Sequence, residues 1–385
     1  MPRVALARAV ISILEAEEVH QWAEAGHTDR GLPDENAGGR GGTAVSIAIT
    51  LLPGDGIGPE IAGAARRVVD ATGVRVDWEE VAVGKQAYCR QGTPVPDEVL
   101  ASARRSGLVL KGPLTNPGGT PYGSPTIMLR RRLGLFASVR FGRAGPGVPS
   151  RFPGMDLVIV REITEDVSAE SSQAVGDQGG IAIRVITRPA SLRVSRFAFD
   201  LARRLGRTCI TVAHVATNFK TTDGLFLAAA REVAAAYPDI GLNDELLDAV
   251  CLHLMRNPAR VDMLLTPNFY GNFLSGLIAG MAGSVGMQSG ADYGESIAMF
   301  EAGHGTLPRH AGKDLANPAG LILAAALLLD HAGETQAGQA IRNAVDCVTA
   351  AGRDVTYDLG GAAGTQAMAD AVVASLGAEA GIKAA

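Results

Sequence analysis

Three arginines, Arg130, Arg140 and Arg161, are the residues of this sequence whose type points most directly to chemistry. A guanidinium group stays charged at neutral pH and can bind a carboxylate through two parallel hydrogen bonds. Three such groups in one part of the chain would suit a small acid that carries more than one carboxylate. The alternative for residues 130–132, which are consecutive arginines, is a solvated basic face of a helix.

Short apolar runs bounded by turn residues recur along the chain, with helical patterns between them. Because strands joined by helices give this alternation, we predict an α/β fold. The first run is followed by residues 53–60, in which glycines permit a tight turn and Pro59 suits the first turn of a helix. The strongly apolar residues 315–329 predict a core helix. The predicted buried strands are residues 45–52, 108–110, 157–160, 209–212 and 263–266.

The first part of the chain differs from the rest. Apolar residues at helical spacing predict an amphipathic helix over residues 4–26. Residues 28–43 are rich in glycine and aspartate and predict a linker. The helix could pack on its own domain or dock onto another subunit, and both alternatives remain open.

Bulk composition excludes several classes of protein. Apolar residues make up 47% and charged residues 19% of the 385 residues, which is typical of a folded α/β protein. The formal net charge of -5 gives no general attraction to nucleic acid or to an anionic membrane. No apolar run is long enough to cross a bilayer, and the apolar stretch at residues 9–14 is too short for a signal peptide. We therefore expect a cytoplasmic protein with no nucleic-acid or membrane partner.

A series of motifs runs in order through residues 46–378. It begins with Leu52-Pro-Gly-Asp-Gly-Ile-Gly-Pro-Glu60, which is not a dinucleotide fingerprint of the GxGxxG type. The later motifs are Lys111–Thr115, Ser124–Arg140, Arg161–Glu162, Glu165–Asp166, Thr222–Phe226, Arg256–Pro258, His304–Thr306, Asn317–Pro318, Ile341–Val345 and Asp358–Gly361. This series resembles the isocitrate and isopropylmalate dehydrogenases, the β-decarboxylating family.

The resemblance implies an isopropylmalate-dehydrogenase-like α/β fold of two domains. Residues 46–135 and 284–380, from both chain ends, would form the large domain, and residues 136–283 the small domain. The small domain would carry a dimer interface, and residues 1–44 would be an N-terminal extension. In such enzymes the active site takes groups from both subunits, so we expect a homodimer or a hetero-oligomer with an intact homologue.

The resemblance also assigns roles to the arginines. Arg130, Arg140 and Arg161 match positions that bind the substrate carboxylates, and Ser124 matches a serine that contacts the substrate. The neighbouring residues 131–132 have no such role and keep the interpretation of a solvated face. The resemblance therefore predicts a small polycarboxylate as the ligand.

A loop from His304 to Asn317 has the length of the family's nucleotide-binding loop. An acidic residue at position 309 would favour NAD, because it can bind the ribose hydroxyls and repels a 2′-phosphate. Arg309 with His310 instead resembles the basic and aromatic pairing of members that use NADP, so we expect NAD or NADP, with NADP favoured. The alternative is a surface loop without a ligand. The family's cofactor positions fall on Asn116, Thr126 (where asparagine is usual), His304, Gly305, Thr306, Arg309, His310 and Asn317.

Family chemistry needs an acceptor for the hydroxyl proton, a divalent metal and an acid. The catalytic lysine falls on Val215, which cannot carry a proton, and the catalytic tyrosine falls on Ser168, which is a much weaker acid. Of three metal-binding aspartates only Asp248 remains, because the other two fall on Asn272 and Gly276. Mg²⁺ and Mn²⁺ prefer anionic oxygen ligands, so we expect weak binding of either metal.

The sequence therefore predicts a divergent family member that binds a small 2-hydroxy di- or tricarboxylate, and NAD(P), without the standard oxidative decarboxylation. Such a protein would act as a regulatory partner of an intact relative or carry out altered chemistry. The alternative is an active NAD(P)-dependent 2-hydroxyacid dehydrogenase that uses substitute residues. A scaffold in which the arginines are only structural is a third interpretation.

Overall fold

The computed structural model describes residues 46–116, 122–167 and 172–383. The predicted N-terminal helix, the predicted linker and Ser168 lie outside these ranges. Within them, no helix is both long enough and apolar enough to cross a membrane.

Ten strands of the described chain form one mixed sheet. In sheet order they are β2 (Val76–Glu80), β1 (Ile47–Leu52), β3 (Leu108–Lys111), β12 (Ala298–Ala302), β11 (Ser289–Tyr293), β4 (Ala137–Arg143), β5 (Asp156–Glu162), β10 (Met263–Thr266), β8 (Cys209–His214) and β9 (Gly241–Leu246). The first four strands are parallel to one another, and so are the last four. Between these two blocks, β11 and β4 pair antiparallel with each other and with their outer neighbours, so the blocks run in opposite directions.

A separate hairpin is formed by β6 (Ser172–Val175) and β7 (Gly179–Ala182). The helices of the described chain are α3 (Gly58–Ala71), α4 (Lys85–Gln91), α5 (Asp97–Ser106), α6 (Pro125–Arg132), α7 (Arg188–Arg204), α8 (Thr222–Ala234), α9 (Leu247–Arg256), α10 (Asn268–Met281), α11 (Ala319–His331), α12 (Thr335–Ala351) and α13 (Thr365–Lys383). Short 3-10 turns occupy Pro258–Arg260, Val285–Met287 and Tyr357–Leu359.

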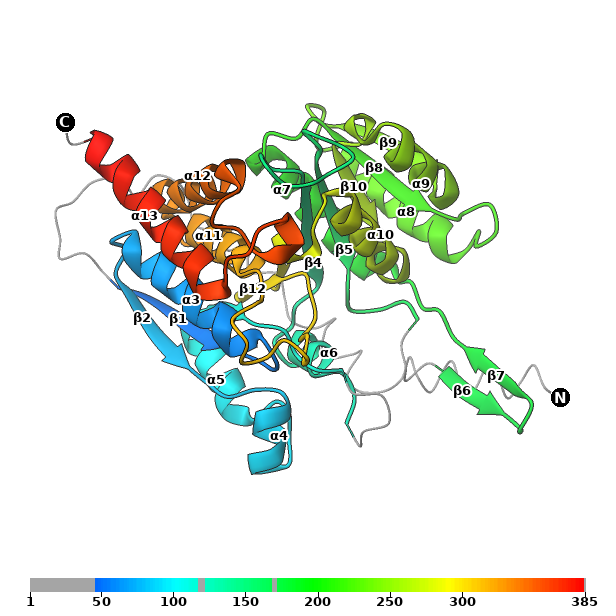
Figure 1. Cartoon of the computed structure of the whole chain (residues 1–385). Helices are drawn as coiled ribbons and strands as arrows, with labels where there is room; N and C mark the ends of the chain where they lie inside the picture. The colour runs from blue at the N-terminus through cyan, green and yellow to red at the C-terminus, as the bar shows by residue number, and fades with distance from the viewer. Residues whose placement is uncertain (1–45, 117–121, 168–171, 384–385) are drawn as a thin grey trace. The chain divides into compact units, whose positions relative to one another are not determined.

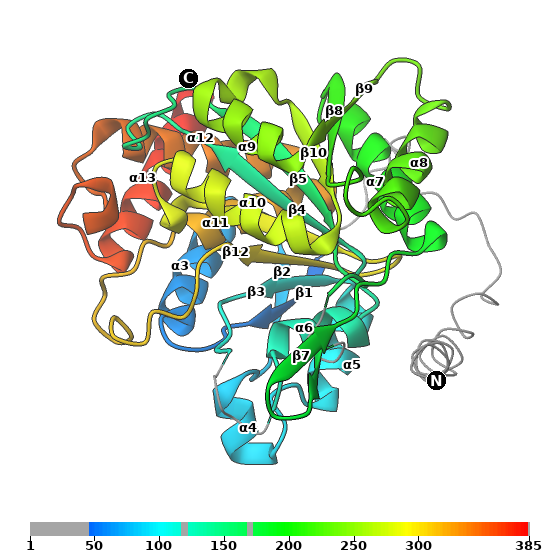
Figure 2. The same ribbon diagram turned by 90° about the vertical axis from the view of Figure 1, so that its right-hand side faces the viewer.

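Helices cover both faces of the ten-stranded sheet. One face packs against α3, α7, α8, α11, α12 and α13 in a continuous core. There α3 lies beside α11 and α13, so segments from both ends of the described chain pack together (Figure 1). The other face carries two separate cores, one under α5 and α6 and one under α9 and α10. Figure 2 shows α10 lying across β4 and β5 on this second face.

These elements confirm the α/β fold class and most of the predicted elements. The predicted strands correspond to β1, β3, β5, β8 and β10, and α3 has its proline in the first turn as expected. The predicted helix over residues 315–329 is wrong at its start, because Asn317 Oδ1 accepts the N–H of Ala319 (2.9 Å) and α11 begins there. The sheet includes strands from residues 46–135 and from residues 136–283, and the division into two domains stays a prediction.

Candidate anion-binding site

A row of charged side chains crosses five adjacent strands on the face of the sheet that α6 and α10 cover. Side chains alternate between the two faces along each strand. The strand registers put the charged residues side by side: Glu301 lies opposite Lys111, and Ser138 lies opposite both Asp292 and Arg161. In sheet order this polar row consists of Lys111, Glu301, Asp292, Arg140 and Arg161.

Arg130 and Arg140 are held by the same two buried carboxylates. Arg130 donates from Nε to Asp292 (2.8 Å) and from Nη2 to Glu301 (3.3 Å). Arg140 donates from Nη1 to Asp292 (3.4 Å) and from Nη2 to Glu301. Lys111 Nζ lies 2.7 Å from the second oxygen of Glu301. The structure thus brings together two of the predicted substrate arginines, each already paired with carboxylates of the protein.

The polar row holds an excess of positive charge. Burial alone would raise the pKa of Glu301, but Lys111, Arg140 and Arg130 lower it below its ordinary value, so this carboxylate is charged. Burial, followed by repulsion from Arg130 and Arg140, lowers the pKa of Arg161 to about 9. The row and Arg130 together contain four basic side chains and two carboxylates. A site with this surplus favours an anion as its ligand.

Arg161 contacts two asparagines at the start of α10. Its Nε and Nη2 donate to Asn268 Oδ1 (2.9 and 2.5 Å), and its Nη1 donates to Asn272 Oδ1 (2.9 Å). Asn268 Nδ2 donates to the backbone oxygen of Glu165 (2.8 Å), which fixes the direction of the amide. The helix approaches this closely because residue 271 is glycine: a Cβ at Gly271 would lie 2.7 Å from Arg161 Cγ.

Gly290 on β11 lets Arg140 pass across the strand to Glu301. A Cβ at this position would lie 2.4 Å from Arg140 Nη1 and 2.6 Å from the backbone oxygen of Val139. We expect Gly290→Ala to displace the guanidinium and to lower the free energy of unfolding by about 1–3 kcal/mol. Denaturant titration measures this change. Gly280→Ala is the control, because its Cβ would meet nothing within 4 Å, and equal effects of the two variants would contradict the proposed crossing.

The other predicted substrate contact lies at the start of α6. Ser124 is the N-cap of this helix, and its Oγ accepts the N–H of Ile127 (3.4 Å). Thr126 lies half-buried in the first turn of α6, and Asn116 is exposed after β3. Ser124 and Thr126 therefore share a short helix with Arg130, while Asn116 lies on a separate segment.

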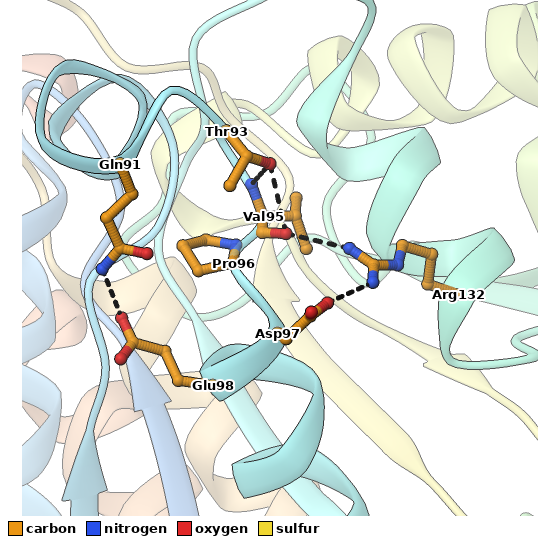
Figure 3. Close-up of a pocket in the computed structure, with 7 residues that line it drawn as sticks. All are labelled: Gln91, Thr93, Val95, Pro96, Asp97, Glu98 and Arg132. Carbon is orange, nitrogen blue, oxygen red and sulfur yellow. Dashed lines mark hydrogen bonds and ion pairs between the residues drawn. The ribbon is translucent and has the colours of Figure 1, made fainter.

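A surface hollow of ≈ 390 Å³ beside α6 contains no residue of the polar row (Figure 3). Its lining residues are Gln91, Thr93, Val95, Pro96, Asp97, Glu98 and Arg132. Arg132 donates to the backbone oxygen of Val95 (3.0 Å) and to Asp97 (2.5 Å). This arginine is therefore tied to α5 and the segment before it rather than to the carboxylates that hold Arg130.

The predicted nucleotide loop follows β12 and is hydrogen-bonded to the first turn of α3 and to the residue before it. The carboxylate of Glu60 accepts the N–H groups of Gly312 and Asp314 (the second at 3.2 Å). The backbone oxygen of Thr306 accepts the N–H of Ile57 (3.0 Å). These bonds hold the loop against the segment that resembles the family's opening motif.

Two histidines of this loop have a buried ring nitrogen without a hydrogen-bond partner, His304 Nε2 and His310 Nδ1. Burial lowers the pKa of His304, and its Nδ1 lies 3.1 Å from the oxygen of Gly305. The ring of His310 meets that of Tyr357 edge-on at 5.7 Å. Buried polar atoms normally have partners, so these two nitrogens fit a site that a nucleotide completes.

The remaining predicted cofactor residues have different surroundings. Arg309 is exposed on the loop. Asn317 is buried, and its Nδ2 donates to Asp358 (2.9 Å) while its Oδ1 accepts the N–H of Ala319 at the start of α11. The nitrogen and the oxygen of the Asn317 amide are therefore both hydrogen-bonded to other groups of the protein.

Residues 48–372 match the family model described as isocitrate/isopropylmalate dehydrogenase. The chain belongs to this family. It is 40% identical to the mitochondrial isocitrate dehydrogenase (NAD) catalytic subunit 5 of Arabidopsis thaliana, with 85% of this chain and 87% of that one covered. It is 39% identical to the 3-isopropylmalate dehydrogenase of Archaeoglobus fulgidus, with 85% and 99% covered. The crystal structure of isocitrate dehydrogenase from Methylococcus capsulatus superposes with a TM-score of 0.82 at 42% identity, covering 86% of this chain and 99% of that one.

The position at which the resemblance puts the family's lysine holds an apolar side chain. Val215 follows β8, which β10 separates from the strand of Arg161, and its N–H donates to Asp223 (2.7 Å). The nearby hydroxyl of Tyr270 donates to the same carboxylate (2.9 Å) and accepts from Arg184 (2.7 Å). Burial, with the charge of Asp223, raises the pKa of Tyr270. This phenol is therefore a poor source of a proton.

The residues at the family's metal positions do not fit a divalent cation. Asn272 directs its amide oxygen at the guanidinium of Arg161, and Gly276 supplies no ligand. The exposed carboxylate of Asp248 accepts the N–H of Ala249 at the start of α9. In the described part of the chain, no group of three or more histidine, cysteine, aspartate or glutamate side chains is placed to hold a metal ion.

Glu165 links Asn268 of α10 to the start of α7. Its carboxylate accepts the N–H and the hydroxyl of Thr187 (2.7 and 2.8 Å). Burial, followed by the charge of Glu162, raises the pKa of Glu165 from 4.5 to about 8. When the pKa of a group is higher in the folded state than in the unfolded state, the protonated group stabilises the fold at pH values below the unfolded-state pKa. This stabilisation is lost as the pH rises through the folded-state pKa.

We therefore expect the free energy of unfolding to fall as the pH rises from about 4.5 to about 8. The slope attributable to one proton is at most about 1.4 kcal/mol per pH unit. Denaturant titrations of the wild type and of Glu165→Gln across this range measure it, because the variant lacks the titrating group. Identical slopes for the two proteins would contradict the assignment.

Several residues of the site were not predicted from the sequence. Asp292 and Glu301 hold the arginines, and Asn268 orients Arg161, but none of them was assigned a role. The available signal was a lone carboxylate within each buried strand, since a buried charge needs a partner. Lys111, the partner of Glu301, was noted only as part of a family motif.

Proposed function

We propose that the polar row and Arg130 bind a small 2-hydroxy di- or tricarboxylate, and that this chain does not carry out the family's standard oxidative decarboxylation. The excess positive charge around Arg161 is the observation that carries the first part. Three guanidinium groups and Lys111 surround only two carboxylates, Asp292 and Glu301. A polycarboxylate would supply the missing negative charge and accept fork-shaped hydrogen bonds.

The second part rests on the absence of side chains that the family's reaction needs at the matching positions. Val215 has no proton to exchange, and the amide of Asn272 and the bare backbone of Gly276 stand where the family has carboxylates. Proton transfer and metal polarisation each contribute large factors to such reactions. Loss of several such groups favours a binding protein, which would regulate an intact relative or carry out altered chemistry.

The loop after β12 supports a nucleotide as a second ligand. His304 and His310 each have an unsatisfied buried nitrogen, and Arg309 supplies a cation next to them. Arginine in this place would attract a 2′-phosphate, so we favour NADP over NAD. A bound nicotinamide nucleotide would supply a hydride acceptor, while the residues of this chain would only hold it.

A second candidate is an active NAD(P)-dependent 2-hydroxyacid dehydrogenase that uses substitute residues. The relatives favour it, because proteins named as dehydrogenases match about 85% of this chain at close to 40% identity. The isocitrate/homoisocitrate dehydrogenase of Thermus thermophilus is also 40% identical over 86% of the chain. Under this candidate the proton carriers would be residues other than Val215 and Tyr270.

One assay separates the two candidates. The purified full chain is mixed with isocitrate, isopropylmalate, homoisocitrate, malate or tartrate, with NAD or NADP and with Mg²⁺ or Mn²⁺, and the absorbance of NAD(P)H is followed. Sustained turnover with any acid would establish the dehydrogenase and overturn the proposal. Without turnover, calorimetric titration of the same acids and of both nucleotides must detect binding, since a chain that binds none of them would be only a scaffold.

We also propose that the chain forms a homodimer or a hetero-oligomer with an intact homologue. Apolar side chains stand exposed on the outer sides of α9 and α10, and two of them, Phe269 and Phe273, stack edge-on at 5.1 Å. Phe273 is 63% exposed and Leu252 is 53% exposed. Patches of this kind often mark protein interfaces. Size-exclusion chromatography with light scattering, alone and with a homologue, tests this.

A further inference from the structure

Arg161 is fixed in place without being neutralised. Three of its N–H groups donate to the amide oxygens of Asn268 and Asn272, at 2.9, 2.5 and 2.9 Å. Both partners are uncharged, so the hydrogen bonds orient the guanidinium but leave its charge in full. A guanidinium has about five N–H groups, and those that remain lie on the two terminal nitrogens. The arrangement leaves Arg161 a fork of donors that suits a carboxylate.

The hydrogen bond from Arg161 also determines what the amide oxygen of Asn272 can bind. This oxygen belongs to a side chain at one of the family's metal positions, yet it accepts a hydrogen bond from Arg161. A divalent cation at this oxygen would face a fixed positive charge at close range, which is unfavourable for both cations. A carboxylate at position 272 would instead form an ion pair with Arg161 and cancel its charge. The amide therefore both excludes the metal and preserves the arginine's charge.

We propose that Arg161 replaces the divalent metal in this chain, so that the polycarboxylate binds without Mg²⁺ or Mn²⁺. Asn272 acts as a positioning residue that aims Arg161 at the ligand. The inference rests on the proposed function, namely that the polar row binds a polycarboxylate. It adds that the cationic partner of the ligand is part of the protein and is always present. Exposed Gly276, one turn after Asn272 on α10, leaves open space on the same side of the helix.

The test is calorimetric titration of the full chain with each acid of the panel, once in EDTA and once in excess Mg²⁺. We expect the dissociation constants in the two conditions to agree within about 2-fold. Binding that requires Mg²⁺, or that tightens by about 10-fold or more with it, would overturn the inference and leave the proposed function intact. Absence of binding in both conditions would overturn the proposed function, and the inference with it.

Two variants sharpen the test. Asn272→Asp should weaken binding in EDTA by about 10-fold or more, because the new carboxylate competes for Arg161. Adding Gly276→Asp puts a second carboxylate one turn further along the helix, and this double variant should bind only when Mg²⁺ or Mn²⁺ is added. Both positions are exposed, so we expect folding to be preserved. Circular dichroism and thermal unfolding check that each variant is folded.

The matched control is Asn343→Asp on the exposed face of α12, where Asn343 accepts a hydrogen bond from Gln339. It makes the same chemical change and adds the same charge away from the site. We expect it to leave both affinities unchanged. If Asn343→Asp weakens binding as much as Asn272→Asp does, the effect is one of net charge and the role of Asn272 is overturned.

Discussion

Replacing Glu301 with alanine is expected to lower the free energy of unfolding by about 3–5 kcal/mol. This carboxylate is 5% exposed and pairs with Lys111, Arg130 and Arg140. Breaking a buried pair is costly because the remaining charges stay buried without a partner. After the substitution only Asp292 would remain to balance the cations of the row. Denaturant titration by circular dichroism measures the change.

The control for this prediction is Asp97→Ala. Asp97 pairs with Arg132, but its side chain is 90% exposed (Figure 3). An exposed ion pair contributes about 1 kcal/mol or less. The prediction fails if the two substitutions destabilise the protein equally. Glu301→Gln should fall between wild type and Glu301→Ala, because an amide can still accept hydrogen bonds but carries no charge.

Replacing Arg140 with alanine is expected to weaken binding of the polycarboxylate by at least about 100-fold. Arg140 lies between Asp292 and Arg161 in the polar row and contributes to the repulsion that lowers the pKa of Arg161. Its removal takes away one ligand donor and reduces the excess positive charge by half. Arg130→Ala should act in the same direction. Calorimetry at fixed ionic strength measures the affinity, and thermal unfolding shows whether each variant is folded.

Arg143→Ala is the matched control for Arg140→Ala. Both arginines lie on β4, but an odd spacing puts Arg143 on the opposite face of the sheet, where it pairs with Asp346 of α12. We expect Arg143→Ala to leave the affinity within about 2-fold of wild type. A conservative variant, Arg140→Lys, should keep part of the affinity, since it retains the charge but loses the planar fork. Normal binding by Arg140→Ala would refute the placement of the carboxylate site.

Local sequence patterns were enough to predict five of the ten strands of the sheet but not the contacts of the site. Apolar runs such as residues 157–160 must be buried wherever they lie, so β5 could be found without knowing its neighbours. The partners of Arg140 depend on the order of five strands and on their registers, which no local pattern encodes. Gly290 shows this well: its role is visible only once Arg140 and Glu301 lie on either side of it.

The contact between Arg161 and Asn272 was missed for a similar reason. The family resemblance identified Asn272 as a lost metal ligand, which is a statement about one position. The group that replaces the metal depends on how α10 lies over β5. Because Gly271 has no side chain, the helix can approach the strand closely. The helix over residues 315–329 was misplaced at its start because the hydrogen bond between the Asn317 side chain and the N–H of Ala319 was not considered.

The arrangement of the sheet has a consequence for how the chain folds during synthesis. β3 and β4 each need a neighbour that comes from β11 and β12, which are made much later in the chain. Until β12 has been synthesised, the edge of β3 that pairs with it, where Leu108 lies opposite Ala298, remains unpaired and apolar. Such edges pair readily with other chains, and non-local strand pairing is slow. The charged row therefore cannot be complete until β11 and β12 have been synthesised and paired, which makes ligand binding a reporter of completed sheet assembly.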